Sequence, residues 1–299
     1  MKGLAIGLAL AALLALGLLV AAVSGAFDKD APQPTAASAR LKVDRFDGGR
    51  AFAELRRQVE MGPRPAGSAA SRRLAARIRG ALPRGRYEQL GPAHPGLRNV
   101  VGHIPGSKPA VVVAAHYDTK ALPGFVGAND GAGGTAAVLE LARVLRDAKR
   151  PAGAPELRFV LFDGEEATDD DADFYRSGLR GSRAYASRHE GELRAVVVLD
   201  FISDKNLRIP REEGSDPKLW ARLRAAARRV GAQAAFPVLK RSPIMDDHTP
   251  FTRDGVPAID LIDFDFPCWH KRCDDMSAVS RRSLDVSGEA VLELLRNWR

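Results

Sequence analysis

Cysteine is scarce in this chain: its 299 residues include only Cys268 and Cys273, which stand close together in the segment CWHKRC. A small scaffold held by disulfides would need more of them. A zinc ribbon would need two close pairs of cysteine or histidine, and one is present. We therefore expect a structural role for these thiols: in an oxidising compartment they can form a disulfide that braces the loop around His270.

Other patterns are also missing. No GxSxG segment follows an apolar run, which excludes the nucleophile elbow of a serine α/β hydrolase, and no internal repeat is visible. The net charge of +8 and the isoelectric point near 9.8 come mainly from arginines spread over the chain. Because no basic run is interleaved with aromatic residues, the sequence argues against a nucleic-acid partner and indicates a solvated basic surface.

The chain begins with an uncharged, apolar stretch. Residues 3–27 are mostly Leu, Ala, Gly and Val, and Lys2 precedes them. This pattern, with small residues at Ser24 and Ala26, resembles a signal peptide, but the run is also long enough to span a bilayer. Residues 1–27 are therefore either a cleaved signal peptide or an N-terminal membrane anchor. In both cases the catalytic domain is exported, whether it is periplasmic, secreted or membrane-anchored outside the cytoplasm.

A linker follows, because residues 28–40 contain Pro32, Pro34 and a stretch of Ala and Ser. Folded structure is expected to begin near Leu41. The remaining residues 41–299 are enough for one large hydrophobic core. We expect a single catalytic domain that is a monomer.

Apolar runs alternate with helical patterns along this domain. The runs PAVVVAAHYDT, LRFVLF and LRAVVVLDF are continuous, as is typical of strands buried on both faces. The expected strands are 100–104, 109–119, 157–162, 193–201 and 257–264, and the expected helices are 51–60, 67–82, about 133–147 and 215–231. This alternation predicts an α/β fold with a twisted, mostly parallel central sheet flanked by helices.

Residues that suit zinc stand at the ends of these apolar runs. They are His116, Asp130, Glu165, Glu166, Asp200 and His270. In an open α/β sheet, residues just past the carboxyl ends of the strands meet in one crevice. Alone, His116 could be a buried, hydrogen-bonded imidazole and Asp130 a helix N-cap. Adjacent glutamates at a strand end, however, repel each other in a partly dry crevice unless a cation or a shared proton relieves them. We predict a zinc site in which one glutamate binds the metal and the other moves a proton.

The same segments resemble a known superfamily. The strings HYDTK, FVGANDGAGG, LFDGEEA, GSRAYA, VLDFI, DDHTPF, GVPAIDLIDF and WH occur in the order seen in zinc aminopeptidases and their relatives, the glutaminyl cyclases. The resemblance covers residues 50 to 299, and the quoted strings lie between residues 116 and 270. The resemblance implies a zinc-aminopeptidase-like fold, in agreement with the strands and helices expected from the apolar pattern. It also implies that the substrates are the N-termini of peptides or proteins.

Two activities compete within this resemblance. In an aminopeptidase, two zinc ions would be bridged by Asp130, with His116 and Asp200 completing one site. Glu166 and His270 would complete the other. The adjacent glutamate would then take the proton from the attacking water.

A glutaminyl-peptide cyclotransferase would instead hold one zinc through Asp130, Glu166 and His270. The α-amine of an N-terminal glutamine would attack its own γ-carboxamide, with zinc polarising the amide oxygen. Glu165 would carry the proton from the amine to the departing ammonia. An intramolecular reaction of this kind needs mainly orientation and charge stabilisation.

Two details favour the cyclase. The segment DDHTPF looks like the cyclase segment whose first aspartate, here Asp246, lies beside the catalytic glutamate in a proton network with Asp200. Trp269 directly precedes His270 and matches a cyclase tryptophan that walls the substrate pocket. A binding protein without activity would be expected to have lost metal ligands, and all of them are present.

The chain also departs from the cyclase pattern. Asp260 stands where a histidine is usual, and Lys271 and Arg272 replace the small residue that usually follows the metal-binding histidine. A second pocket tryptophan after DGEE is absent, which predicts a less aromatic pocket. The acidic stretch 169–173 in its place could be a solvated loop, a calcium site or a binding site for a free α-amine, and we expect a solvated loop because charge runs are usually exposed.

Overall fold

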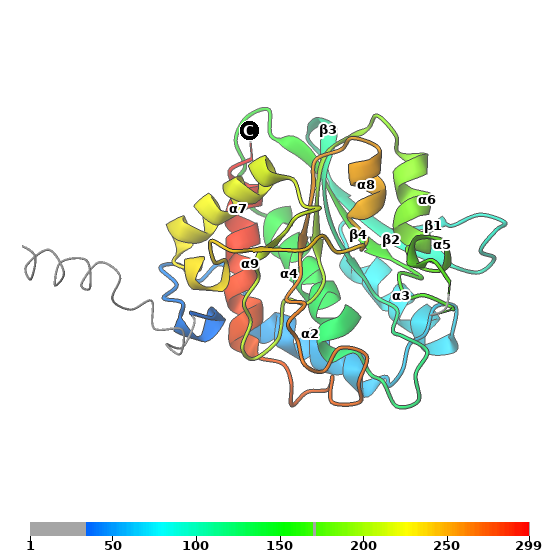
Figure 1. Ribbon diagram of the computed structural model, residues 1–299. Coiled ribbons are helices and arrows are strands. Elements are labelled where there is room, and N and C mark those ends of the chain that lie inside the picture. Colours follow the sequence, from blue (N-terminus) through cyan, green and yellow to red (C-terminus); the bar gives the residue numbers. More distant parts are fainter. Residues whose placement is uncertain (1–33, 170–171, 299) are drawn as a thin grey trace, which may run out of the picture. The chain divides into compact units, whose positions relative to one another are not determined.

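The structure is a computed structural model that describes residues 34–169 and 172–298 (Figure 1). The expected signal peptide or anchor, residues 1–27, and the first part of the expected linker lie outside the described residues. Within the described part of the chain, no helix is long and apolar enough to cross a membrane.

A six-stranded sheet forms the centre of the fold, in the order β1-β2-β4-β3-β5-β8. The strands are β1 (Arg86–Gln89), β2 (Arg98–Ile104), β3 (Ser107–His116), β4 (Pro155–Phe162), β5 (Leu193–Leu199) and β8 (Ala258–Leu261). Strands β4, β3, β5 and β8 run parallel, whereas β2 runs antiparallel to β4, and β1 at the edge of the sheet runs antiparallel to β2. The predicted α/β fold with a mostly parallel central sheet is confirmed. The sequence pattern does not predict β1, because its residues RYEQ form no apolar run.

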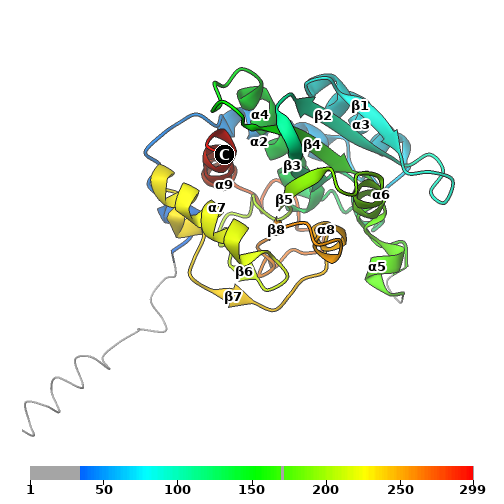
Figure 2. The ribbon, with the colours of Figure 1, turned by 90° about the horizontal axis from the view of Figure 1, so that it is seen from above.

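Helices cover both faces of the sheet. They are α2 (Gly48–Glu60), α3 (Ala69–Ala81), α4 (Gly134–Arg146), α5 (Phe174–Ser177), α6 (Arg180–Arg188), α7 (Pro217–Val230), α8 (Thr249–Arg253) and α9 (Arg281–Arg296). Figure 2 shows α6 and α8 on one side of the sheet and α2, α4 and α9 on the other. The helices predicted at 51–60, 67–82, 133–147 and 215–231 correspond to α2, α3, α4 and α7. Shorter elements complete the chain: η1 (Ala36–Ser38), η2 (Ala128–Gly133), η3 (Gln233–Ala235), β6 (Arg211–Glu212) and β7 (Lys240–Arg241).

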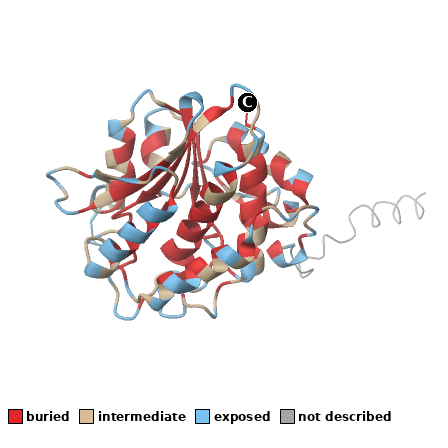
Figure 3. Ribbon diagram, turned by 180° about the vertical axis from the view of Figure 1, so that it is seen from behind, coloured by how far each residue is buried: buried red, intermediate tan, exposed pale blue. Residues whose placement is uncertain are grey.

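Strand β3 contributes to two hydrophobic cores. Val111, Val113 and Ala115 belong to the core built with α2, α4, α7 and α9, whereas Val112 and Ala114 belong to the core built with α6 and α8. Successive side chains of a strand point to opposite faces of the sheet. A strand covered on both faces therefore needs a continuous apolar run, and the central strands are buried accordingly (Figure 3).

Packed structure begins earlier than the expected Leu41. Residues Ala36–Ser38 form the short helix η1, and Ala36 and Ala39 are buried. The Ala36 N–H donates to the Leu207 carbonyl over 2.9 Å. The last part of the expected linker therefore belongs to the domain, because its small apolar residues fit against the core.

A close approach between α4 and β5 brings two parts of the chain together near the strand ends. Gly134 is the first residue of α4, and a Cβ atom there would lie 2.0 Å from the Leu199 carbonyl oxygen. Leu199 directly precedes Asp200, and Gly134 follows the turn that carries Asp130. The absence of a side chain at position 134 therefore sets the separation of these two acidic residues.

We expect Gly134→Ala to lower the free energy of unfolding by about 1–3 kcal/mol, because the added methyl group pushes helix and strand apart. Gly80→Ala is the matched control, since a Cβ at Gly80 in α3 would meet nothing within 4 Å. The control should be neutral or stabilising by up to about 1 kcal/mol, as alanine is the better helix former. Urea denaturation measures both; equal midpoints for the two variants would contradict the tight contact.

Candidate active site

The turns that follow the parallel strands supply the site. His116 is the last residue of β3, Glu165 and Glu166 follow β4, and Asp200 follows β5. Asp130 lies in η2, directly before α4. His270 lies in the loop after β8. The structure brings all of these predicted residues together, because the carboxyl ends of parallel strands lie at one edge of the sheet.

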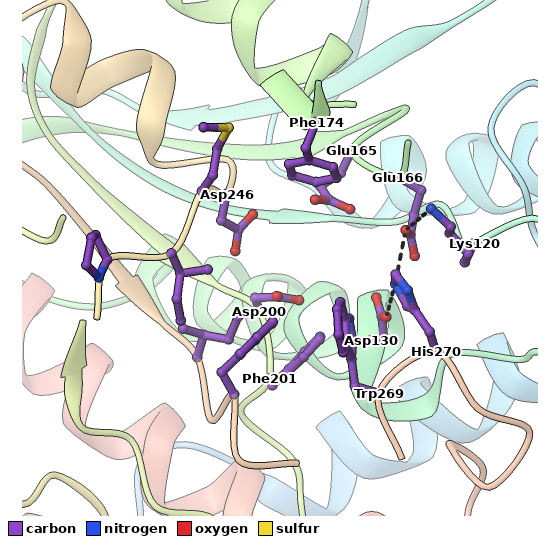
Figure 4. Close-up of a pocket in the computed structure, with 15 residues that line it drawn as sticks. Lys120, Asp130, Glu165, Glu166, Phe174, Asp200, Phe201, Asp246, Trp269 and His270 are labelled. Carbon is purple, nitrogen blue, oxygen red and sulfur yellow. Dashed lines mark ion pairs between the residues drawn. The ribbon is translucent and has the colours of Figure 1, made fainter. Parts of the chain in front are cut away.

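Asp130 is shared by two clusters of possible metal ligands, each with its ligand atoms within 4.8 Å of one another. In the first, His116 Nε2 lies 3.3 Å from Asp130 Oδ1 and 3.2 Å from Asp200 Oδ1. In the second, His270 Nε2 lies 3.6 Å from Asp130 Oδ2 and 3.4 Å from Glu166 Oε2 (Figure 4). The two oxygens of Asp130 thus face different clusters, as a bridging carboxylate would require.

These donors fit zinc. Two ligands that each lie about 2.0–2.1 Å from a tetrahedral zinc ion are roughly 3.3 Å apart, close to the separations found here. Imidazole nitrogen and carboxylate oxygen are both common zinc ligands. The Oε1 atom of Glu166 is buried and has no hydrogen-bond partner among the described residues. A metal ion in the second cluster would give this side chain the partner that a buried carboxylate needs.

The raised pKa values of the buried carboxyl groups also fit a cation site. Burial raises the pKa of Glu165 well above its usual value, and burial together with Asp130 raises the pKa of Glu166 to about 7. Burial also raises the pKa of Asp200, with Asp246 adding to the effect. In the metal-free protein these carboxyl groups therefore hold protons near neutral pH, and a bound cation would displace them.

The pKa of the His116 imidazole is also raised, but here the bound proton makes the side chain positively charged. Burial acts to lower its pKa, but hydrogen bonds to Asp118, Asp130 and Asp200 raise it well above the usual value. Without a metal ion, His116 therefore supplies the positive charge between Asp130 and Asp200. Nε2 of His116, which faces Asp130 and Asp200, can bind a metal ion once its proton is displaced.

Asp118, which the sequence pattern does not identify as a site residue, positions the two glutamates. Its Oδ1 accepts hydrogen bonds from the backbone N–H groups of Gly164 and Glu165 over 3.0 and 3.1 Å. Its Oδ2 accepts from Glu166 over 3.3 Å. The available signal was a carboxylate at the end of a buried strand, two residues after His116.

Asp274 has a similar role for the turn that carries Asp130, and the sequence pattern does not identify it as a site residue either. Its carboxylate accepts hydrogen bonds from the backbone N–H groups of Asn129 and Asp130 over 2.7 and 3.1 Å. Asp274 is fully buried and stands four residues beyond His270 in the sequence. It therefore connects the turn that carries one possible metal ligand with the loop that carries another.

A pocket of about 530 Å³ opens beside the two clusters. Its lining includes Glu165, Asp200, Asp246 and Trp269, as well as the possible metal ligands Asp130, Glu166 and His270 (Figure 4). Trp269 is 43% exposed, and its ring lies 4.6 Å from the His270 ring, measured between centroids. The residues expected from the cyclase resemblance thus lie around one cavity.

Several aromatic side chains line the pocket, although the second tryptophan after DGEE is absent. Phe174, Phe201 and Phe264 line it with Trp269. The rings of Phe201 and Phe264 are stacked with centroids 6.2 Å apart, and Phe264 lies 4.9 Å from Trp269. Phe174 is the first residue of α5, whereas Phe201 and Phe264 lie in the loops after β5 and β8, so their convergence on the pocket is visible only in the folded chain. Lys120 also lines the pocket, with Nζ 4.0 Å from Glu166 Oε2.

Asp260 is fully buried behind Asp246. Burial, with Asp246 adding to the effect, raises the pKa of Asp260 well above its usual value. His248 lies between two acids: its Nδ1 is 3.9 Å from Asp260 Oδ2 and its Nε2 is 3.5 Å from Glu212 Oε1. Although Asp260 replaces the histidine usual in cyclases, an imidazole from another position is thus close to it.

The remaining expectations concern two loops. Cys268 and Cys273 form a disulfide, as expected. In the acidic stretch 169–173, Asp169 and Asp173 are exposed, and Asp173 accepts a hydrogen bond from the backbone N–H at the start of α5. Asp170 and Asp171 lie outside the described residues.

Comparison with known proteins identifies relatives of both expected kinds. A profile of the family described as "Peptidase family M28" matches residues 99–295. The glutaminyl-peptide cyclotransferase of Bothrops jararaca is 31% identical over 232 residues, which cover 62% of this chain and 61% of that protein. The chain thus spans about 61% of the length of this curated relative.

Solved structures of relatives have the same fold. A glutaminyl cyclase from an Acidobacteriales bacterium superposes with a TM-score of 0.74 at 30% identity and covers 86% of this chain and 96% of its own. A leucine aminopeptidase precursor from Bacteroides thetaiotaomicron superposes with a TM-score of 0.75 at 26% identity and covers 87% and 100%. The fold therefore does not separate the two activities.

We expect the chelated protein to lose roughly 1–3 kcal/mol of unfolding free energy between about pH 4 and pH 7. The pKa of Glu166 in the folded state, about 7, lies above that in the unfolded chain, so the folded state binds more protons and stability falls as pH rises. Zinc should stabilise the protein increasingly over this range, because its ligands bind it deprotonated. Thermal denaturation with chelator and with zinc at each pH measures both effects.

Glu166→Gln is the control for this prediction, because its side chain has no proton to lose. The chelated variant should show a smaller loss of stability with rising pH, as well as weaker stabilisation by zinc. An unchanged pH dependence in this variant would mean that Glu166 does not hold a proton in the folded, metal-free protein.

Proposed function

We propose that this chain, which belongs to peptidase family M28, is a glutaminyl-peptide cyclotransferase. It would convert the N-terminal glutamine of peptides or proteins to pyroglutamate and release ammonia. The observation that carries the proposal is that Asp246 and Trp269, the two residues associated with cyclases by resemblance, line the same pocket as Glu165. The similarity to curated glutaminyl-peptide cyclotransferases supports it.

Family M28 is zinc-dependent. Asp130, Glu166 and His270 would hold the ion, since they form the cluster nearest the pocket wall made by Trp269. When bound there, zinc would polarise the γ-amide carbonyl of the substrate. The remaining work of the reaction falls to side chains of the protein.

Glu165 would move the proton. The α-amine nitrogen forms a bond with the γ-carbonyl carbon, and the Glu165 carboxylate accepts the proton that the amine gives up. The bond from that carbon to the amide nitrogen then breaks, and Glu165 returns the proton to the departing ammonia. Burial raises the pKa of Glu165, which suits a group that both accepts and returns a proton near neutral pH.

Asp246 and Asp200 would adjust the charge around this glutamate. The charge of Asp246 acts on both Glu165 and Asp200, and it raises the pKa of each after burial. Trp269 would hold the substrate against the metal side of the pocket and exclude water. Orientation of amine and amide is the main requirement of an intramolecular cyclisation.

A second candidate is a di-zinc aminopeptidase. The cluster of His116, Asp130 and Asp200 supports it, because it offers a complete second ligand set with Asp130 as the bridge. Under this alternative, Glu165 would take its proton from water. The similarity to a leucine aminopeptidase precursor is compatible with it.

The proposed enzyme is exported and acts outside the cytoplasm. The disulfide between Cys268 and Cys273 supports this location, because disulfides persist in oxidising compartments.

A mass-spectrometric time course tests the activity directly. We expect the purified protein with zinc to remove ammonia from a peptide that begins with free glutamine and to leave a peptide that begins with leucine intact. The zinc-free protein is the control. Release of the first residue from the leucine peptide would establish the aminopeptidase instead. If neither peptide were converted, both proposals would be contradicted.

Two variants separate the mechanisms. Glu165→Gln should retain zinc and lose turnover by several orders of magnitude, because the proton carrier is removed while the pocket keeps its shape. His116→Ala should abolish activity if the protein is a di-zinc peptidase. If it is a one-zinc cyclase, the variant should retain measurable activity. Turnover on the glutamine peptide and zinc content by elemental analysis measure both. Unchanged turnover in Glu165→Gln would exclude its role as the proton carrier.

A further inference from the structure

The disulfide encloses the residues that complete the metal cluster and the pocket wall. Between Cys268 and Cys273 lie Trp269 and His270, followed by Lys271 and Arg272. Lys271, Arg272 and Cys273 are exposed, and the His270 side chain, at 27% exposure, is far more accessible than those of Asp130 and Glu166. The loop therefore has little burial of its own to hold His270 in place.

The backbone of His270 adopts a conformation that favours glycine. Its φ angle is +52°, in the left-handed region. A residue with a Cβ atom reaches this region at an energetic cost and stays there only when its surroundings enforce it. The position of the imidazole between Asp130 and Glu166 depends on this conformation, so something outside the residue must maintain it.

The two cysteines connect the loop to different parts of the site. Cys268 packs against the cluster of Phe201, Ile262 and Phe266, which adjoins the aromatic wall of the pocket. Cys273 directly precedes Asp274, whose carboxylate binds the backbone of the Asp130 turn. The disulfide thus ties the wall of the pocket to the turn that carries the shared metal ligand.

Hydrogen bonds add to this closure. The Lys271 N–H donates to the Cys268 carbonyl and the Asp274 N–H to the Lys271 carbonyl, each over 3.0 Å. Arg272 Nε donates to the Pro123 carbonyl over 3.1 Å. The last of these bonds is exposed, so it competes with water and contributes little without the covalent closure.

We propose that Cys268 and Cys273 are positioning residues for the metal centre: their disulfide holds His270 in its left-handed conformation, and so holds the imidazole against Asp130 and Glu166. The inference rests on the metal centre of the proposed function but not on which reaction that centre performs. A centre that depends on this bond binds its metal tightly only where the disulfide is formed. The bond would therefore couple zinc loading to an oxidising compartment.

Zinc affinity of the double variant Cys268→Ser with Cys273→Ser tests the proposal. We expect it to fall about 10–100-fold, the range typical when residues that orient a metal ligand are removed. Competition with a chelating dye measures the affinity without reference to activity. The double variant avoids chemical reductants, whose thiols bind zinc themselves.

Lys271→Ala is the matched control. It lies in the same loop and its Nζ donates to the Pro267 carbonyl, but its side chain is exposed and outside the pocket lining. Its zinc affinity should stay within about twofold of the unmodified protein, since a factor of two is less than 0.5 kcal/mol. Equal affinities in the double variant, Lys271→Ala and the unmodified protein would overturn the proposal.

Two readouts distinguish positioning from a general loss of structure. Saturating zinc should restore the turnover of the double variant on whichever peptide the unmodified protein accepts, because only metal loading is impaired. In the zinc-free state, trypsin should cleave after Lys271 or Arg272 faster in the double variant, because the loop is released. Failure of zinc to restore turnover, together with unchanged cleavage in the loop, would count against positioning.

A second double variant guards against a folding defect. Cys268→Ala with Cys273→Ser avoids a hydroxyl beside Phe201 and Phe266, where Cys268 is half-buried. It should show the same fall in zinc affinity. If it folded and bound zinc as tightly as the unmodified protein, the disulfide would have no positioning role. Zinc affinity is informative even if neither peptide is turned over, so the failure of this proposal and that of the proposed function remain distinguishable.

Discussion

Buried carboxylates that repel one another lie together at one edge of the sheet, and hydrogen bonds fix the turns that carry them. Asp130, Glu165, Glu166 and Asp200 are all buried there. Burial raises the pKa values of Glu165, Glu166 and Asp200, so in the metal-free protein part of the charge is offset by protons. A bound cation offsets the charge more completely. Without a cation, such a cluster costs stability.

The fold holds this unfavourable cluster in place through buried acceptors that bind backbone N–H groups. Asp118 fixes the turn after β4, and Asp274 fixes the turn before α4. The close contact of Gly134 with β5 sets the separation of the two turns that lie on either side of it. His270 stands apart from this pattern, because its loop is exposed and closed by a disulfide. The possible metal ligands thus lie on turns at the strand ends and on one loop closed by a disulfide.

The possible metal ligands suit either of the two candidate reactions, and the lining of the pocket bears on which of them we propose. An enzyme that cyclises its substrate must hold amine and amide together and exclude water, whereas a peptidase must admit water. The aromatic chain from Phe201 through Phe264 to Trp269 favours exclusion of water. Asp246 also lines the pocket. Both features belong to loops, where related enzymes with one fold differ most.

The amino-acid sequence alone predicts the central strands and the residues at their ends, because apolar runs and the polar residues that follow them are local features. It also indicated the disulfide, since the two cysteines are close in the chain. The residues that support the site from a distance are visible only in the folded chain: Asp274 binds the backbone of Asn129 across 145 positions of sequence, and Phe174 and Phe264 line the same pocket. These contacts depend on how loops pack in space, and the pattern of apolar and polar residues along the chain does not predict that packing.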